Sequence, residues 1–181
     1  QHFAIASEGG HSDLAPSTLE DENIFALIDR PYGRLTVETI LSGNGLLRLH
    51  RARNQYFGLT TEDIHDPSRI TANARQERSS VEAQTIMHFW NILASFAGNM
   101  ALTMGARQGV FIAGGIMPKL TAFLDPILFR SRFDGGGPMH EYRRAISTSL
   151  VINEASPIEA LNAIALSPQH FAIDYARRCW T

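Results

Sequence analysis

Cysteine is almost missing from this sequence. Cys179 is the single cysteine among 181 residues. A disulfide within the chain is therefore excluded, as is a zinc site built from several thiolates. The near-absence of cysteine is typical of a protein that works in a reducing compartment, so we expect a cytoplasmic location.

Two other features are also missing: an excess of charge of one sign and a long hydrophobic run. Sixteen basic and 18 acidic residues give a net charge of −2 and a pI near 6.4. This balance offers no basic surface for nucleic acid or an anionic membrane. No apolar run is long enough to cross a bilayer. We expect neither partner, and the 181 residues with 44 % hydrophobic content are enough for one domain, 1–181.

The elements that the pattern does predict alternate between helices and short apolar strands. A long helix is expected over 79–104, where apolar residues recur every three or four positions from Ile86 to Met104. Short buried strands are expected at 110–113 and 149–152. The alternation indicates an α/β fold, in which the long helix packs against the sheet.

A short motif near the start of the chain combines a carboxylate and an imidazole. In the segment 7–16, SEGGHSDLAP, two glycines separate Glu8 from His11. Glycine allows a tight turn and a close ligand, and the two side chains offer acceptors and a donor that suit adjacent sugar hydroxyls. Taken alone, the motif could equally be a plain turn.

A second motif, ETILSGNGL, covers residues 38–46. Thr36 is expected to cap a short helix that places Glu38 in its first turn, where the helix N-terminus favours an ionised carboxylate. Gly43 is expected to end that helix. Without other information, Glu38 is as consistent with an exposed helix-start carboxylate as with a ligand contact.

A third motif, GVFIAGGI, covers residues 109–116. Gly114 and Gly115 follow the expected strand and precede a helix that starts at Pro118. This order lets a flat base or a ribose approach the backbone. A glycine pair by itself is a weak signal.

Together the three motifs resemble the bacterial glucokinase family, ATP-dependent kinases of the actin-like superfold. The family's sugar loop reads Glu-Gly-Gly-His-x-Asp-Phe-Ala-Pro, and here Leu14 replaces the Phe. The resemblance implies an actin-like ATPase (ribonuclease H-like) lobe, with a mixed five-stranded sheet flanked by helices. It assigns the chain to the larger, C-terminal lobe. The family phosphorylates glucose in the first step of glycolysis and is commonly homodimeric.

The same resemblance assigns site residues. Glu8, His11 and Glu38 are expected to bind glucose, and Gly114 and Gly115 the adenosine part of ATP. Mg²⁺ is expected to be held mainly by an N-terminal lobe. No metal ligand is expected among the residues of this chain.

Parts of the family's machinery are not found in this sequence. Its catalytic aspartate belongs to an Asn-Asp pair, and no such dipeptide occurs here. Its phosphate loops, of the types Asp-x-Gly-Gly-Thr and Gly-x-Gly-x-Gly, are also missing. Because the first motif is under way by Ser7, we interpret the chain as a piece of a longer enzyme that is inactive by itself.

A departure near the C-terminus bears on nucleotide binding. The family usually places glycine at the helix start after the last strand, where this chain has Pro157-Ile158-Glu159. The bulkier start is expected to narrow the nucleotide cleft. It motivates an alternative, a non-catalytic sugar-sensing module derived from a kinase. A third interpretation is an unrelated α/β domain with coincidental motifs.

Overall fold

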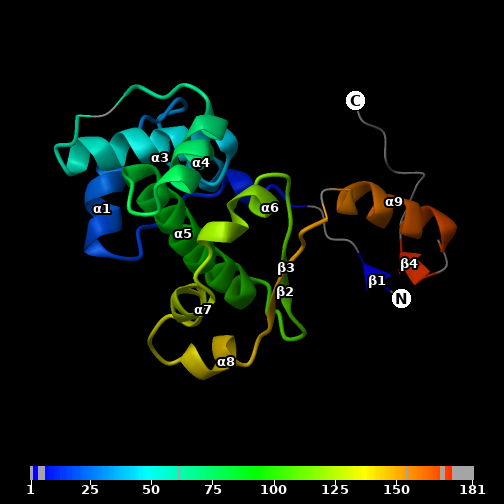
Figure 1. Ribbon diagram of the computed structural model, residues 1–181. Helices are drawn as coiled ribbons and strands as arrows, with labels where there is room; N and C mark the ends of the chain where they lie inside the picture. The colour runs from blue at the N-terminus through cyan, green and yellow to red at the C-terminus, as the bar shows by residue number, and fades with distance from the viewer. Residues whose placement is uncertain (1, 4–6, 61, 154, 168–169, 173–181) are drawn as a thin grey trace.

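The computed structural model describes residues 2–3, 7–60, 62–153, 155–167 and 170–172 (Figure 1). The lone cysteine and the last residues lie outside these ranges, as does part of the apolar run 3–6, which the sequence predicts as a strand. Within them, the elements in chain order are β1 His2–Phe3, a 3-10 turn Gly9–His11, α1 Leu19–Ala26, α2 Val37–Ile40, α3 Gly43–Tyr56, α4 Pro67–Gln76, α5 Val81–Thr103, β2 Val110–Ile112, α6 Met117–Leu120, a 3-10 turn Thr121–Phe123, α7 Pro126–Asp134, α8 His140–Arg144, β3 Thr148–Leu150, α9 Ser156–Leu166 and β4 Phe171–Ala172.

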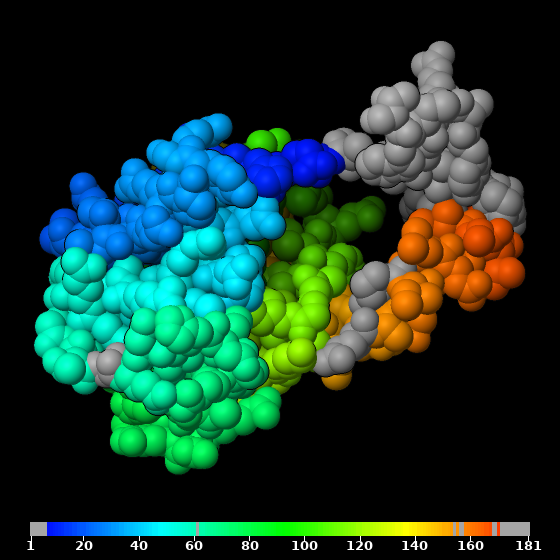
Figure 2. Space-filling model, turned by 90° about the horizontal axis from the view of Figure 1, so that it is seen from above, coloured from blue at the N-terminus to red at the C-terminus, as the bar shows by residue number. Residues whose placement is uncertain are grey.

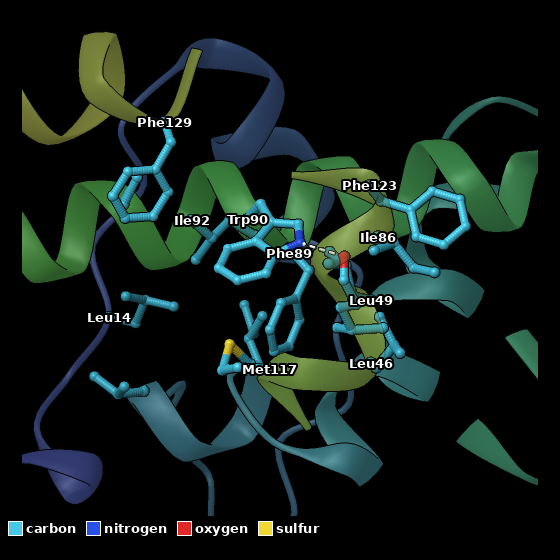
Figure 3. Close-up of a cluster of buried hydrophobic side chains, with 14 of the residues drawn as sticks. Leu14, Leu46, Leu49, Ile86, Phe89, Trp90, Ile92, Met117, Phe123 and Phe129 are labelled. Carbon is cyan, nitrogen blue, oxygen red and sulfur yellow. Dashed lines mark hydrogen bonds between the residues drawn. The ribbon is translucent and has the colours of Figure 1, made fainter. Parts of the chain in front are cut away.

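The long helix α5 forms the centre of the molecule. Its residues Ile86, Phe89 and Trp90 are buried, and Figure 3 shows them inside a cluster contributed by several elements. The Trp90 ring meets Phe129 of α7 edge to face, with centroids 6.1 Å apart. Its indole N–H donates to the Leu120 carbonyl at 3.1 Å, so the buried ring leaves no unpaired donor.

The prediction that the long helix, α5, packs against the sheet was wrong. In the described residues the helix packs mainly against α3, α4 and α7, and no strand is among its main neighbours. The reason is the width of its apolar surface, which reaches around the helix and is too broad for a narrow sheet to cover. The C-terminal end of the expected stripe leaves the core, since Met104 is 59 % exposed.

The strands form two parallel pairs in the described residues. β2 pairs with β3 in the register Val110–Thr148 to Ile112–Leu150, and β1 pairs with β4. The α/β class is confirmed, but the described strands form these two pairs where a five-stranded mixed sheet was expected. The strand at 110–113 is parallel as expected, yet it is not fully buried, because Phe111 is 74 % exposed.

Side-chain caps mark the starts of α1 and α5, and the second agrees with the start of the long helix predicted over 79–104. The Thr18 hydroxyl accepts from the Asp21 N–H at 3.0 Å, and the Ser80 hydroxyl accepts from Ala83 at 3.1 Å. Each cap satisfies an N–H that has no partner within its helix. The expectation for Gly43 was wrong: Ser42 caps α3, so Gly43 begins a helix instead of ending one.

The pair β1–β4 and helix α9 lie to one side of the main body (Figure 1), and α9, in orange, stands apart from it in Figure 2. Helix α9 exposes the apolar side chains of Ile158, Leu161 and Leu166. The expectation of a single domain over 1–181 stays a prediction. Among the helices of the described ranges, none has the length and apolar character needed to traverse a lipid bilayer.

A polar network crosses the interior between α1, α3 and α5. Arg53 donates to His88 Nδ1 at 2.9 Å and to Glu20 at 3.1 Å, and His88 Nε2 lies 2.6 Å from an Asp21 oxygen. Because Arg53 can only donate, Nδ1 of His88 must accept, so the ring proton sits on Nε2 and is donated to Asp21. The neutral imidazole thereby joins three helices.

A second buried imidazole, His50 on α3, is also held neutral. The Thr85 hydroxyl donates to the Val81 carbonyl at 2.8 Å, so its oxygen accepts from His50 Nδ1–H at 3.2 Å. Asn54 donates to His50 Nε2 at 3.1 Å. Burial lowers the pKa of His50 below its usual 6.5, since removing water disfavours the charged ring.

The approach of α7 to α5 yields a first prediction. A Cβ on Gly98 of α5 would collide with the Phe133 backbone carbonyl of α7. Gly98→Ala is therefore expected to destabilise the protein by about 1–3 kcal/mol through overpacking, although alanine favours helices. Gly43→Ala is the matched control, because a Cβ there would meet its nearest neighbour, Pro67, at 3.9 Å. Urea unfolding measures both, and equal stability of the two variants would contradict the close approach.

The burial of His50 predicts how stability depends on pH. The unfolded chain binds a proton near pH 6.5, whereas the folded chain resists it, so stability is complete above that pH and declines as pH falls through the lowered pKa. His50→Gln is expected to flatten the dependence between pH 7.5 and 5. His65→Gln, at an exposed position, is expected to leave it unchanged. Denaturant titrations across this pH range measure how the free energy of unfolding changes with pH. An unaltered pH dependence in His50→Gln would contradict the role given to His50.

Candidate functional site

The first predicted motif folds into a tight 3-10 turn over Gly9–His11. The His11 N–H donates to the Glu8 carbonyl at 2.9 Å, and the Ser12 hydroxyl donates to the Gly9 carbonyl at 2.7 Å. Neither Gly9 nor Gly10 has a positive φ. A Cβ on Gly9 or Gly10 would also meet its nearest neighbour at an ordinary contact distance, 3.5 Å or 3.9 Å, so the turn itself requires glycine at neither position. The turn presents the side chains of Glu8 and His11 on the surface.

The second motif places Glu38 in the first turn of α2, as predicted. Thr36 and Thr39 cap this short helix reciprocally, each side chain accepting from the other's backbone N–H. Gly45 of the same motif lies directly against the end of α2, where a Cβ would collide with the Ile40 backbone. The glycine thus allows α3 to follow α2 at a sharp angle, and this fixes the short helix that carries Glu38.

The structure brings the three predicted sugar-binding residues together. His11 Nδ1 lies 3.6 Å from a Glu38 oxygen, and His11 Nε2 lies 4.0 Å from a Glu8 oxygen. The side chains are 67 %, 61 % and 90 % exposed for His11, Glu38 and Glu8 respectively. These distances exceed ordinary hydrogen bonds, so the donors and acceptors remain available to a ligand.

Backbone hydrogen bonds join the loop to the segment before α2. The Leu14 N–H donates to the Leu35 carbonyl at 3.0 Å, and the Val37 N–H donates to the Ser12 carbonyl at 3.0 Å. This pairing explains why residues 27 positions apart in the sequence, His11 and Glu38, become neighbours. The loop and α2 form one unit.

An open depression of about 600 Å³ adjoins this unit. His11 and Glu38 line it, together with Tyr32, Arg34, Asn44 and Arg48; Glu8 is not among the lining residues. Sequence reasoning missed Tyr32 and Arg48, which belong to no recognisable motif. Asn44 lies within the second motif. Most of the lining residues have polar side chains, which could bind a ligand with several hydroxyl groups.

Gly114 and Gly115 occupy the predicted position after β2 and before α6. Gly114 has φ of +136°, a conformation that favours glycine, and its carbonyl accepts from the Met117 N–H at 3.3 Å. No atom lies within 4 Å of where a Cβ would stand on either glycine. The turn therefore leaves open space against the backbone. Neither glycine lines the depression beside Glu38.

Two further expectations concern the nucleotide and metals. The glycine-free segment forms the start of α9, with proline in the first turn, but its effect on a nucleotide cleft stays a prediction. Within the described ranges, no three His, Cys, Asp or Glu side chains gather in a way that could hold a metal ion.

Comparison with known proteins places these observations in a family. A family model described as Glucokinase matches residues 1–167. The glucokinase of Allorhizobium ampelinum is 34 % identical, over 98 % of this chain and 52 % of its own length. The glucokinase of Caulobacter sp. strain K31 is 35 % identical, over 91 % of this chain and 49 % of its own length.

A solved structure agrees with the sequence matches. The crystal structure of a glucokinase from an Antarctic psychrotroph superposes with a TM-score of 0.80 at 32 % identity, covering 90 % of this chain and 51 % of that one. The chain spans about half the length of the curated relatives it matches. The paired motifs, the family model and the superposition agree, and the chain belongs to the glucokinase family, with its actin-like ATPase fold.

Proposed function

We propose that this chain is the larger, C-terminal lobe of a glucokinase, an enzyme that transfers the γ-phosphoryl group of ATP to the 6-hydroxyl of glucose. The observation that carries the proposal is the convergence of Glu8, His11 and Glu38 from two separate motifs. Matches to glucokinases over nearly the whole chain support it. They favour a kinase lobe over a sugar-sensing module.

The three side chains would orient glucose. Glu8 and Glu38 accept hydrogen bonds from hydroxyl groups, and His11 between them can donate through one ring nitrogen and accept through the other. A sugar that lacks one of these hydroxyls would leave a polar group of the site unpaired, which disfavours its binding. The site thereby selects a hexose and fixes the position of its reactive hydroxyl.

The nucleotide would lie against the turn at Gly114 and Gly115, whose open backbone suits a flat base or a ribose. An amino-terminal lobe would supply the catalytic base, the phosphate loops and most of the contacts to Mg²⁺, which would neutralise phosphate charge. We accordingly expect no kinase activity from this chain alone. A cytoplasmic homodimer without nucleic-acid or membrane partners remains our expectation. Asp-x-Gly-Gly-Thr and Asn-Asp motifs encoded upstream in the parent gene would support the kinase. Their absence would support the non-catalytic sugar-sensing module.

Replacement of Glu38 tests the sugar site. Glu38→Gln keeps the shape of the side chain but removes the charge that strengthens hydrogen bonds, so the dissociation constant for glucose is expected to rise about ten-fold or more. Glu62→Gln is the control, because the exposed fraction of Glu62, 62 %, matches that of Glu38 and its partner is Arg69. Isothermal titration of glucose into each variant measures the effect. Unchanged affinity in Glu38→Gln would exclude Glu38 from the site.

Replacement of Gly115 tests the nucleotide contact. A Cβ at this position would meet no atom within 4 Å, and Gly115 has no positive φ, so Gly115→Val is expected to fold normally. It should nevertheless obstruct a ligand that approaches the backbone and raise the dissociation constant for ADP, leaving that for glucose unchanged. Gly136→Val, at an equally open glycine, is the control. Titration calorimetry with ADP measures both dissociation constants. Native affinity for ADP in Gly115→Val would show that adenosine does not bind at this turn.

A further inference from the structure

An ion pair links the sugar loop to the segment that leads into α2. Arg34 approaches one oxygen of Asp13 with two nitrogens, Nε and Nη2, each at 2.9 Å. The hydrogen bond from Arg34, together with its charge, lowers the pKa of Asp13 below its usual 3.8. Asp13 is thus held in its charged form, as an acceptor for Arg34.

The pair sits beside the contacts that create the site. Asp13 follows His11 by two residues, and Arg34 precedes Glu38 by four. Between them, Asp13 and Thr36 form an antiparallel bridge. His11 lies two residues before Asp13 on one segment, and Glu38 lies two residues after Thr36 on the other. A loss of register between the two segments would therefore move His11 away from Glu38.

The charge of Arg34 opposes electrostatic repulsion between the joined segments. The joined segments, 7–14 and 34–38, carry three carboxylates, Glu8, Asp13 and Glu38, and like charges repel. Arg34 is the one permanently positive side chain in these segments. Its attraction for Asp13 opposes the repulsion that would separate the loop from α2.

We propose that Asp13 and Arg34 are positioning residues, which hold the loop in register with α2 so that His11 lies between Glu8 and Glu38. The pair acts through those side chains and does not itself bind the sugar. The role in sugar binding rests on the proposed function, whereas the role in holding the register does not.

Amide hydrogen exchange tests the register without a sugar. The informative amides are those of Leu14 and Val37, which donate across the joined segments. Arg34→Gln is expected to speed their exchange about two- to five-fold, in keeping with the small contribution of exposed ion pairs. The reversed pair, Asp13→Arg with Arg34→Asp, is expected to restore the native rates. Arg69→Gln, which breaks the exposed pair with Glu62, should leave both amides unchanged.

Glucose titration of the same variants tests the consequence for binding. Arg34→Gln is expected to raise the dissociation constant about two- to five-fold, and the reversed pair to return it to the native value. Weak binding in both would show that Arg34 contacts the sugar directly, which overturns the proposal, as would native exchange rates in Arg34→Gln. If the native chain binds no glucose, the proposed sugar site of this chain fails, and the exchange rates still decide whether the pair holds the register.

Discussion

The burial of α5 among α3, α4 and α7 is the interaction on which the rest of the structure depends. Its apolar surface is too broad to be covered by one neighbour, so it organises several helices around itself. Helix α3 packs against α5, and α2 packs against the start of α3 through Gly45. The position of Glu38 at the surface is thereby set by apolar contacts in the interior.

The interior also holds polar groups whose protonation is fixed by geometry. Arg53 can only donate, and the Thr85 hydroxyl has already given its proton to a carbonyl, so each histidine beside them has one acceptable neutral tautomer. Buried polar networks are favourable only when their members find partners. The hydrogen bonds of Arg53 and His88 join α1, α3 and α5, although Arg53 Nε has no partner among the described residues, and they make the relative placement of these helices specific.

The candidate sugar site differs from the core in being open. His11, Glu8 and Glu38 are mostly exposed, and the depression beside them is open to solvent. In the proposed enzyme, phosphoryl transfer would require water to be excluded. This openness agrees with a chain that spans about half the length of its relatives. In the proposed enzyme, the second lobe would close over the sugar and supply the reacting groups.

The sequence by itself determined the family, the three sugar-binding candidates and the start of several helices, since caps and short motifs are local signals. It also placed Gly114 and Gly115 in a turn between a strand and a helix. It did not predict correctly which elements pack against α5 or how many strands the sheet has, because a broad apolar surface does not reveal what covers it. Only the tertiary structure decided that Arg34 faces Asp13 and that His11 meets Glu38, because pairing between distant segments leaves no periodicity in the sequence.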